Sequence, residues 1–275
     1  MVDFEYLFLD IYDDLIDEIR FLCNSKVRLK ILNSLYNEPK TMRELNTLAL
    51  LSYSSISNNL GKLEREGFLV KKDRKYYLTN IALLNLFNCA DFNNSIHVAN
   101  AFSDFLRTHD ISPFCNDSLR DISALDGSRL VESVSIDICK PHNEFKAHVE
   151  SANTLKIIFS YLHPDYPKMI KKLLYKGVNI EILVNKDILD VFIGQLGVKF
   201  IKDAISNGKL SLKYLTTNVK LSLAISDTFV SVGLFKIDGS FDDNRLLISE
   251  ENSAISWAED LFENHSKNAL FVNIN

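Results

Sequence analysis

Residues 52–79 read SYSSISNNLGKLEREGFLVKKDRKYYLT. The first half of this stretch predicts an amphipathic helix, because Ile56, Leu60 and Leu63 recur at helical spacing. Its other side carries short polar residues, which favour a helix less than Glu or Lys would. Gly67 is expected to end the helix, since glycine accepts a left-handed backbone. The sequence therefore raises the question of what the exposed side of this helix binds.

A β-hairpin is predicted directly after the helix. Strands are expected over 68–71 and 76–79, joined by a charged turn over 72–75. At strand period, Val70, Tyr76 and Leu78 are predicted to face inward.

Two shorter helices are predicted before residue 52. Ser25 is suited to cap the first, and Pro39 lies just beyond its end. Thr41 begins the second, with Glu44 three residues later in a capping box. Ser52 caps the third helix. Three short helices followed by a hairpin predict a winged helix-turn-helix.

The polar helix face and the basic hairpin favour DNA as the partner. Short side chains allow close approach to the major groove, Ser and Asn can hydrogen-bond base edges, and Lys and Arg can reach phosphates. Residues 25–80 carry 11 Lys and Arg against 5 Asp and Glu, whereas the rest of the chain carries 20 against 31. A solvated polar face is the ordinary alternative. The predicted DNA-contacting residues are Thr41, Arg43, Ser54, Ser55, Asn58, Asn59, Lys62, Arg65, Lys71, Lys72, Arg74, Lys75 and Tyr76.

The composition of the 275-residue chain predicts a cytoplasmic protein that does not enter a membrane. Its net charge is −5, 47% of residues are hydrophobic, and we find neither a secretory leader nor an apolar run of about 18 residues. The cysteines are scattered without a CxxC pair, so we expect reduced thiols rather than a zinc ribbon or a dithiol switch. They are Cys23, Cys89, Cys115 and Cys139.

Four segments are expected, in an α+β / α/β chain. Residues 1–24 predict an acidic amphipathic helix, 25–80 the DNA-binding domain and 81–110 a helical linker that forms the dimer. Residues 111–275, after a boundary near Pro113, predict an α/β sensor domain for effector binding or assembly.

The sensor domain begins its regular pattern with a predicted βαβ unit. Strand 155–161, helix 166–175 and strand 178–185 follow one another, with Gly177 ending the helix. The remaining expected elements are a long helix over 187–207, strands over 211–214, 221–225 and 229–235, and a helix over 254–262.

Polar residues at the carboxyl ends of these strands predict an effector pocket, since ligands of open α/β sheets bind there. A helix cap over 163–165 and ordinary loop polarity are the alternatives. The predicted pocket residues are Ser160, Tyr161, His163, Tyr166, Asn185, Thr216, Asn218, Ser226 and Asp227.

No metal site or cofactor is predicted. His142, Glu144, His148 and Glu150 lie close in sequence, but their spacing is not typical of a zinc site. We interpret these four side chains as solvated charge.

Two partial resemblances refine this picture. Residues 51–69 and Tyr76-Tyr-Leu-Thr79 resemble the ArsR-like winged-helix repressors, which implies a homodimer with recognition helices in successive major grooves. The metal sites of that family need a cysteine pair or His/Asp clusters; the sequence has no such pair, so metal sensing is not inferred.

Residues 157–160 and 173–184 resemble half of a phospholipase-D-type domain. Active enzymes of that superfamily need HxK followed by four residues and Asp. Here Lys220 stands at the His position and Ser222 at the Lys position, and only Asp227 remains. His265-Ser-Lys267 lacks the Asp. The chain is therefore expected not to be an enzyme.

Four further stretches carry a resemblance that, with the N-terminal match, covers nearly the whole chain: residues 122–133, His163-Pro-Asp-Tyr166, Leu234-Phe-Lys-Ile-Asp-Gly239 and Ile255-Ser-Trp-Ala-Glu-Asp-Leu-Phe262. In these stretches the chain resembles the archaeal Fil-type methanogenesis regulators, which share the layout of the TrmB-like regulators. The resemblance implies a transcription regulator that binds an operator as a dimer, with a possible small-molecule effector. The alternatives are a phospholipase-D-like phosphodiesterase or nuclease with a DNA-targeting domain, and a winged-helix protein-interaction module.

Overall fold

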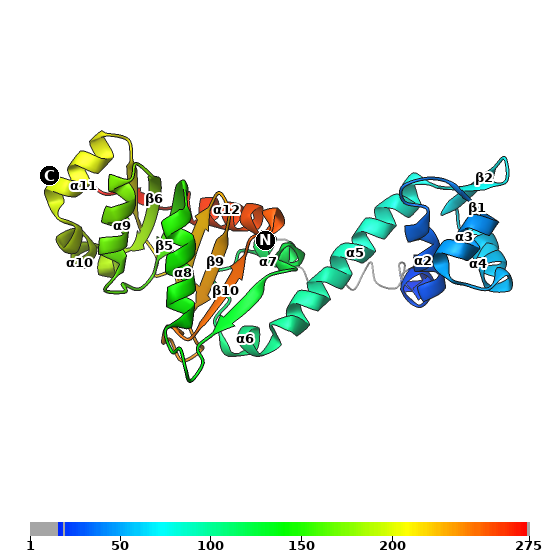
Figure 1. Cartoon of the computed structure of the whole chain (residues 1–275), viewed down its shortest axis with the longest axis horizontal. Helices are drawn as coiled ribbons and strands as arrows, with labels where there is room; N and C mark the ends of the chain where they lie inside the picture. Colours follow the sequence, from blue (N-terminus) through cyan, green and yellow to red (C-terminus); the bar gives the residue numbers. More distant parts are fainter. Residues whose placement is uncertain (1–15, 19, 274–275) are drawn as a thin grey trace. The chain divides into compact units, whose positions relative to one another are not determined.

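The computed structural model describes residues 16–18 and 20–273, in two compact units that divide between Asn93 and Asn94 (Figure 1). This division lies within the predicted 81–110 linker. The amphipathic helix predicted over 1–24 falls mostly outside the described residues. Of its apolar stripe, Leu22 is described and is buried in the core of the first unit.

Helices in the first unit begin where the sequence predicts. The hydroxyls of Ser25 and Ser52 each accept a backbone N–H from three residues further on, at 3.3 Å. Thr41 and Glu44 form the predicted capping box. The elements are α2 (Lys26–Ser34), β1 (Lys40–Thr41), α3 (Met42–Ala49), α4 (Tyr53–Arg65), β2 (Leu69–Lys72), β3 (Lys75–Leu78) and the first part of α5 (Asn80–Ala101).

The hairpin joins β1 in a three-stranded sheet of order β1-β3-β2. Asp73 and Arg74 form its two-residue turn with φ of 48° and 68°, which fixes the register. Leu69 therefore pairs with Leu78 and is buried, whereas Val70 is 43% exposed. The prediction that Val70 faces inward was wrong, because a shift of one residue changes the face of the sheet.

The second unit is built on an eight-stranded mixed sheet of order β11-β7-β6-β5-β8-β9-β10-β4. Strands β5, β6 and β7 are parallel, and β8 runs antiparallel to β5. The bounds are α6 (Ser103–Thr108), α7 (Asn116–Arg120), η1 (Ile122–Leu125), β4 (Arg129–Glu132), α8 (Lys140–Ser151), β5 (Thr154–Phe159), α9 (Tyr166–Tyr175), β6 (Asn179–Asn185), α10 (Lys186–Leu196), α11 (Val198–Ser206), β7 (Leu210–Leu215), β8 (Leu221–Ser226), β9 (Val230–Leu234), β10 (Arg245–Ser249), α12 (Asn252–Ser266) and β11 (Leu270–Phe271).

Helices cover both faces of this sheet, and strand β5 shows the alternation. Ile157 and Phe159 point into the core beneath α8 and α9, and Ile158 points into the opposite core beneath α12. Trp257 of α12 is buried in that second core. Its indole N–H donates to the backbone oxygen of Ser118 at 2.8 Å, which ties α12 to α7.

The mixed α and β class and the parallel βαβ unit are confirmed, with α9 spanning the predicted residues. The single long helix predicted over 187–207 was wrong. Gly197, at φ 87°, separates α10 from α11, since a left-handed backbone ends a helix. Among the described residues, we find no helix with the length and apolar character to cross a bilayer.

Candidate functional site

Helix α4 presents a polar stripe opposite its buried apolar residues. We define this stripe by Ser54, Asn58, Lys62 and Arg65, which recur every three or four residues and are all exposed. Within the described part of the chain, the Asn58 side chain makes no hydrogen bond and neither Lys62 nor Arg65 makes an ion pair. The Asn58, Lys62 and Arg65 side chains are free to contact a partner, whereas the Ser54 hydroxyl shares a hydrogen bond with the Ser52 hydroxyl at 3.2 Å.

Other predicted DNA-contacting residues of this region already have partners within the protein. The Asn59 side chain donates to the backbone oxygen of Ser55 at 2.8 Å, and both residues are half-buried. Thr41 is engaged in the capping box, and its hydrogen bonds hold the pKa of Glu44 below the usual range. Arg43 is exposed. The structure thus favours the polar stripe and Arg43 over these three.

The hairpin formed by β2 and β3 adds exposed cations: Lys71, Lys72, Arg74 and Lys75. Tyr76 does not lie with them, since it is 7% exposed and the Lys71 ammonium lies 5.3 Å from its ring centroid. Tyr76 therefore packs into the unit rather than presenting a free ring. A short turn that carries only charged residues can approach a phosphate backbone.

The predicted effector residues lie at two opposite ends of the strands in the sheet, and not all at one end. Because β8 runs antiparallel to β5, Ser226 and Asp227 lie at the amino end of β5, where Asp227 accepts from the Asn153 backbone N–H at 3.1 Å and its side chain at 2.8 Å. The prediction that these two residues lie at the same end of the strands as Ser160 and Tyr161 was wrong. They line a separate open pocket of about 1020 Å³.

Several residues at the expected edge serve the fold. Ser160 donates to the Leu221 backbone oxygen at 2.6 Å, and the Asn185 side chain bonds Asn218 at 2.7 Å. Thr216 donates to the backbone oxygen of Asn268 at 3.4 Å. The first two hydrogen bonds tie the ends of β5 and β6 to the start of β8 and the segment before it, and the third ties the end of β7 to the segment between α12 and β11.

The other three residues line a pocket of about 310 Å³ at the carboxyl end of β5: Tyr161, His163 and Tyr166. The two tyrosine hydroxyls hydrogen-bond each other. Burial raises the pKa of Tyr161 to about 12 and raises the pKa of Tyr166 as well. Both phenols are therefore neutral at physiological pH. Phe241 stacks on Tyr161, with ring centroids 3.7 Å apart, and covers one side of the pocket.

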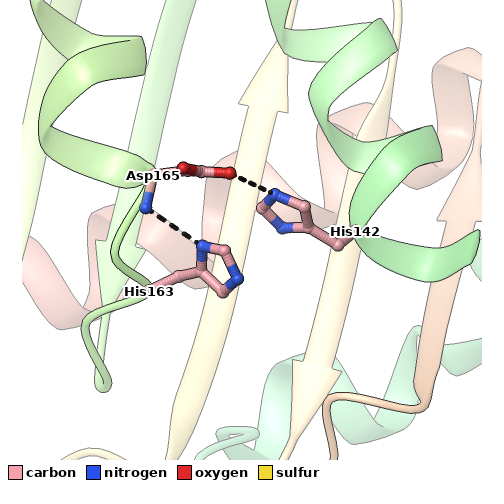
Figure 2. Close-up of side chains that lie close together, drawn as sticks. All are labelled: His142, His163 and Asp165. Atoms are coloured by element: carbon pink, nitrogen blue, oxygen red, sulfur yellow. Dashed lines mark hydrogen bonds and ion pairs between the residues drawn. The ribbon is translucent and has the colours of Figure 1, made fainter. Parts of the chain in front are cut away.

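Two histidines and an aspartate meet in this pocket (Figure 2). His142 comes from the first turn of α8, and His163 and Asp165 come from the loop between β5 and α9. The imidazole centroids lie 3.9 Å apart, and His142 Nε2 is 3.3 Å from Asp165 Oδ2. Burial and the neighbouring His142 lower the pKa of His163, and the hydrogen bond to His142 lowers the pKa of Asp165.

Sequence reasoning missed this cluster because it compared His142 with its neighbours on the same helix. His148 lies instead against Phe229, with ring centroids 5.0 Å apart, and 3.8 Å from a Glu250 carboxylate oxygen. The contact of His142 with residue 163 depends on the packing of α8 beside α9, which local spacing does not show.

The positions that the phospholipase resemblance singles out do not meet in one site. Lys220 pairs with Asp110 at 3.5 Å, Ser222 lines the pocket of about 310 Å³, and Asp227 lies at the other edge of the sheet. His265 is engaged with the Pro113 backbone oxygen at 3.0 Å.

Two protein-family models match separate parts of the sequence. The model described as "Methanogenesis regulatory protein FilR1, N-terminal domain" matches residues 16–89, and the corresponding middle-domain model matches residues 138–268. The methanogenesis regulatory protein FilR1 of Methanothrix harundinacea (strain 6Ac) is 20% identical over 258 residues, which cover 92% of this chain and 58% of the relative. The chain thus spans less than two thirds of that relative's length.

Two solved structures are similar at low TM-score. TrmBL2, an archaeal chromatin protein, is 16% identical, with 94% of this chain and 99% of that chain covered and a TM-score of 0.43. Phosphatidylserine synthase of Haemophilus influenzae Rd KW20 is 12% identical, with 53% and 39% covered and a TM-score of 0.39. Both the N-terminal and the middle-domain models match in chain order, so the chain belongs to the FilR1 family of archaeal methanogenesis regulatory proteins.

Proposed function

We propose that the chain is a transcription regulator whose first unit reads double-stranded DNA. The observation that carries this proposal is the polar stripe of α4, with the exposed cations of the β2–β3 hairpin in the same unit. A helix of this kind fits the major groove, where Ser and Asn can bond base edges, while Lys and Arg neutralise phosphates. Membership of a family of regulatory proteins supports the same reading.

The regulator would bind its operator as a homodimer through α5. This helix has 22 residues, and Asp91 is its only residue among Asp, Glu, Lys and Arg. Ile81, Leu84 and Phe92 lie on one side of it and are 60%, 64% and 60% exposed. We call these three the apolar face of α5. Apolar exposure of this extent on a helix with so little charge is typical of an interface.

The second unit would sense an effector rather than catalyse a reaction. Its pocket of about 310 Å³ offers histidine, carboxylate and tyrosine groups. The residues required for phospholipase chemistry are replaced by Lys220 and Ser222, and Asp227 is distant from the pocket side of β5. Effector binding would shift the population between two dimer arrangements with different operator affinity.

The first experiment measures binding of the full chain to the DNA upstream of its own gene, by fluorescence anisotropy at several salt concentrations. Specific binding that weakens steeply with salt is expected, against a scrambled duplex of equal length. Replacing Lys62, Lys72 and Arg74 with alanine should weaken binding and reduce the slope of log affinity against log salt by up to about 3, since each phosphate contact contributes about 0.9.

The matched control removes three exposed lysines of the second unit: Lys168→Ala, Lys199→Ala and Lys202→Ala. Equal effects of the two triple variants would contradict the assignment of the interface. Absence of salt-dependent DNA affinity in the unaltered chain would favour a protein-interaction module. Hydrolysis of a phosphodiester that is lost on Asp227→Ala would favour the phosphodiesterase alternative.

A further inference from the structure

The cluster of His142, His163 and Asp165 brings together one ligand atom from each side chain, all within 4.8 Å of one another. We propose that these residues form a binding site for a divalent transition-metal ion such as Zn²⁺. The proposal deepens the sensing role of the second unit, and only its regulatory meaning rests on that proposed function.

The donor set selects the class of ion. Two imidazole nitrogens and one carboxylate oxygen suit Zn²⁺, Co²⁺ or Ni²⁺, whereas Mg²⁺ and Ca²⁺ prefer oxygen ligands alone. The pocket wall also carries the Asp243 carboxylate, and its Arg245 side chain is paired with Glu132 at 3.1 Å. Negative charge beside the imidazoles favours a cation over an anion.

The distances are close to those that a bound ion needs. Zinc bonds of about 2.0–2.1 Å place tetrahedral ligand atoms about 3.4 Å apart. His142 Nε2 and Asp165 Oδ2 already lie 3.3 Å apart. The two imidazole rings are stacked with their planes inclined by 26°, so one ring has to turn out of the stack for both nitrogens to direct their in-plane lone pairs at one ion. The largest separation, at most 4.8 Å, then closes by no more than about 1.4 Å.

The conformation of Asp165 supports the assignment independently. Asp165 stands at the N-cap of α9, where an aspartate normally accepts a backbone N–H and contributes about 1 kcal/mol to stability. Its side chain makes no such hydrogen bond and turns to His142 instead. Figure 2 shows this orientation, with the Asp165 carboxylate turned to His142 while His163 Nδ1 accepts the Asp165 backbone N–H at 3.2 Å. Helix capping therefore does not explain the position of this carboxylate.

The site would keep a coordination position open. Three protein ligands leave the fourth tetrahedral position to water or to a small ligand. Tyr161, Ser222 and Phe241 line the same pocket of about 310 Å³, which leaves room for such a group. An open position distinguishes a sensing or exchanging site from a closed structural one.

The test is titration of the EDTA-treated full chain with Zn²⁺ by calorimetry, without DNA, and with Co²⁺ by visible absorption. We expect one saturable site per chain and the ligand-field bands of tetrahedral Co²⁺. His163→Gln and Asp165→Asn should each weaken Zn²⁺ binding by at least about 100-fold, beyond the 10–100-fold effect of outer-sphere changes. His148→Ala, which removes an imidazole from the same helix as His142, should leave affinity unchanged.

Circular dichroism of each variant establishes that loss of binding is not loss of folding. Cys139 also lines the pocket but is not one of the three grouped residues, so Cys139→Ser should retain the site. No saturable binding by the folded wild-type chain, or equal affinity in the His163 and Asp165 variants, would overturn the proposal. Loss of binding on Cys139→Ser alone would also overturn it. None of these results bears on operator binding, which is measured separately with EDTA present.

Discussion

Gly61 lies in the middle of α4 on its exposed side. A Cβ atom placed there has nothing within 4 Å, so packing in the first unit does not require glycine. Glycine in a helix interior costs about 0.5–1 kcal/mol relative to alanine. We therefore expect Gly61→Ala to raise the free energy of unfolding by that amount in urea titrations. The same change should also weaken operator binding, because the added methyl group would hold α4 away from the major groove. We expect a loss of roughly tenfold, which is at the lower end of the range for losing one base contact.

Gly194 of α10 provides the matched control. It is also exposed, in a helix, with nothing within 4 Å of a placed Cβ. Gly194→Ala should stabilise the second unit and leave DNA affinity unchanged. Tight operator binding by the Gly61→Ala variant would show that the bare backbone of α4 plays no part in docking.

Prediction at single residues succeeded where local physics determines the answer. Caps at Ser25, Thr41 and Ser52 depend on residues three positions away, and the structure confirms them. Two predictions at single residues were wrong. Whether Val70 faces inward depends on the register of the hairpin, and the position of Asp227 depends on the direction of β8 relative to β5. Neither register nor strand direction is encoded in the local pattern.

A buried hydrogen-bonded pair anchors the segment that follows α6 to the sheet of the second unit. His109 Nδ1 donates to the Phe105 backbone oxygen at 2.6 Å and Nε2 lies 3.0 Å from an Asp242 carboxylate oxygen. The Thr108 hydroxyl also lies 3.1 Å from Nδ1, and the Lys236 ammonium lies 3.6 Å from the other carboxylate oxygen of Asp242. The side chains of His109 and Asp242 are 1% and 4% exposed. Leaving a buried polar group without its hydrogen-bond partner costs about 1–3 kcal/mol. Asp242→Asn should therefore destabilise the unit by about 1–3 kcal/mol.

Urea unfolding followed by fluorescence of Trp257, the single tryptophan, reports on this unit. The exposed pair of His97 and Asp126, at 2.7 Å, is the comparison. Their side chains are 70% and 39% exposed, so Asp126→Asn should cost about 0.5 kcal/mol or less. Comparable losses in the two variants would contradict the larger stabilising role assigned to the buried pair of His109 and Asp242.

Elements were predicted best where a strand or helix has a clear period and a stop signal. Helix α9 ends before Gly177, and its bounds match the prediction. Helix α8 and strands β4 and β10 were not predicted. Helix α8 begins with Lys140-Pro-His and includes several charges, and the two strands are short segments that pair with each other although they lie far apart in sequence. Their stability comes from tertiary contacts rather than from local propensity.

At the scale of the whole molecule, the sequence predicted a DNA-binding first unit, which stays a prediction, and a pocket in the second unit, but not what that pocket contains. The charge asymmetry and the helix order both follow from composition and spacing. The meeting of His142 with His163 and Asp165 requires α8 and the β5–α9 loop to pack together. Contacts of this kind arise only when the complete sheet is assembled, so a single sequence does not reveal them.

The apolar face of α5 leads to the last prediction. If two copies pair through it, Leu84→Glu together with Phe92→Glu places charges in an apolar interface, where they cannot be solvated. Sedimentation velocity should then show a monomer where the wild-type chain is a dimer, with the dimer dissociation constant raised by at least about tenfold, since burying each side chain is worth about 1.5–3 kcal/mol. Ile237→Glu, at a residue 70% exposed in the second unit, should leave the dimer intact.

Operator affinity should fall when the dimer dissociates, because two recognition helices on one duplex bind more tightly than one. A monomeric wild-type chain would contradict the homodimer, and a dimer that tolerates both charges would place the interface elsewhere.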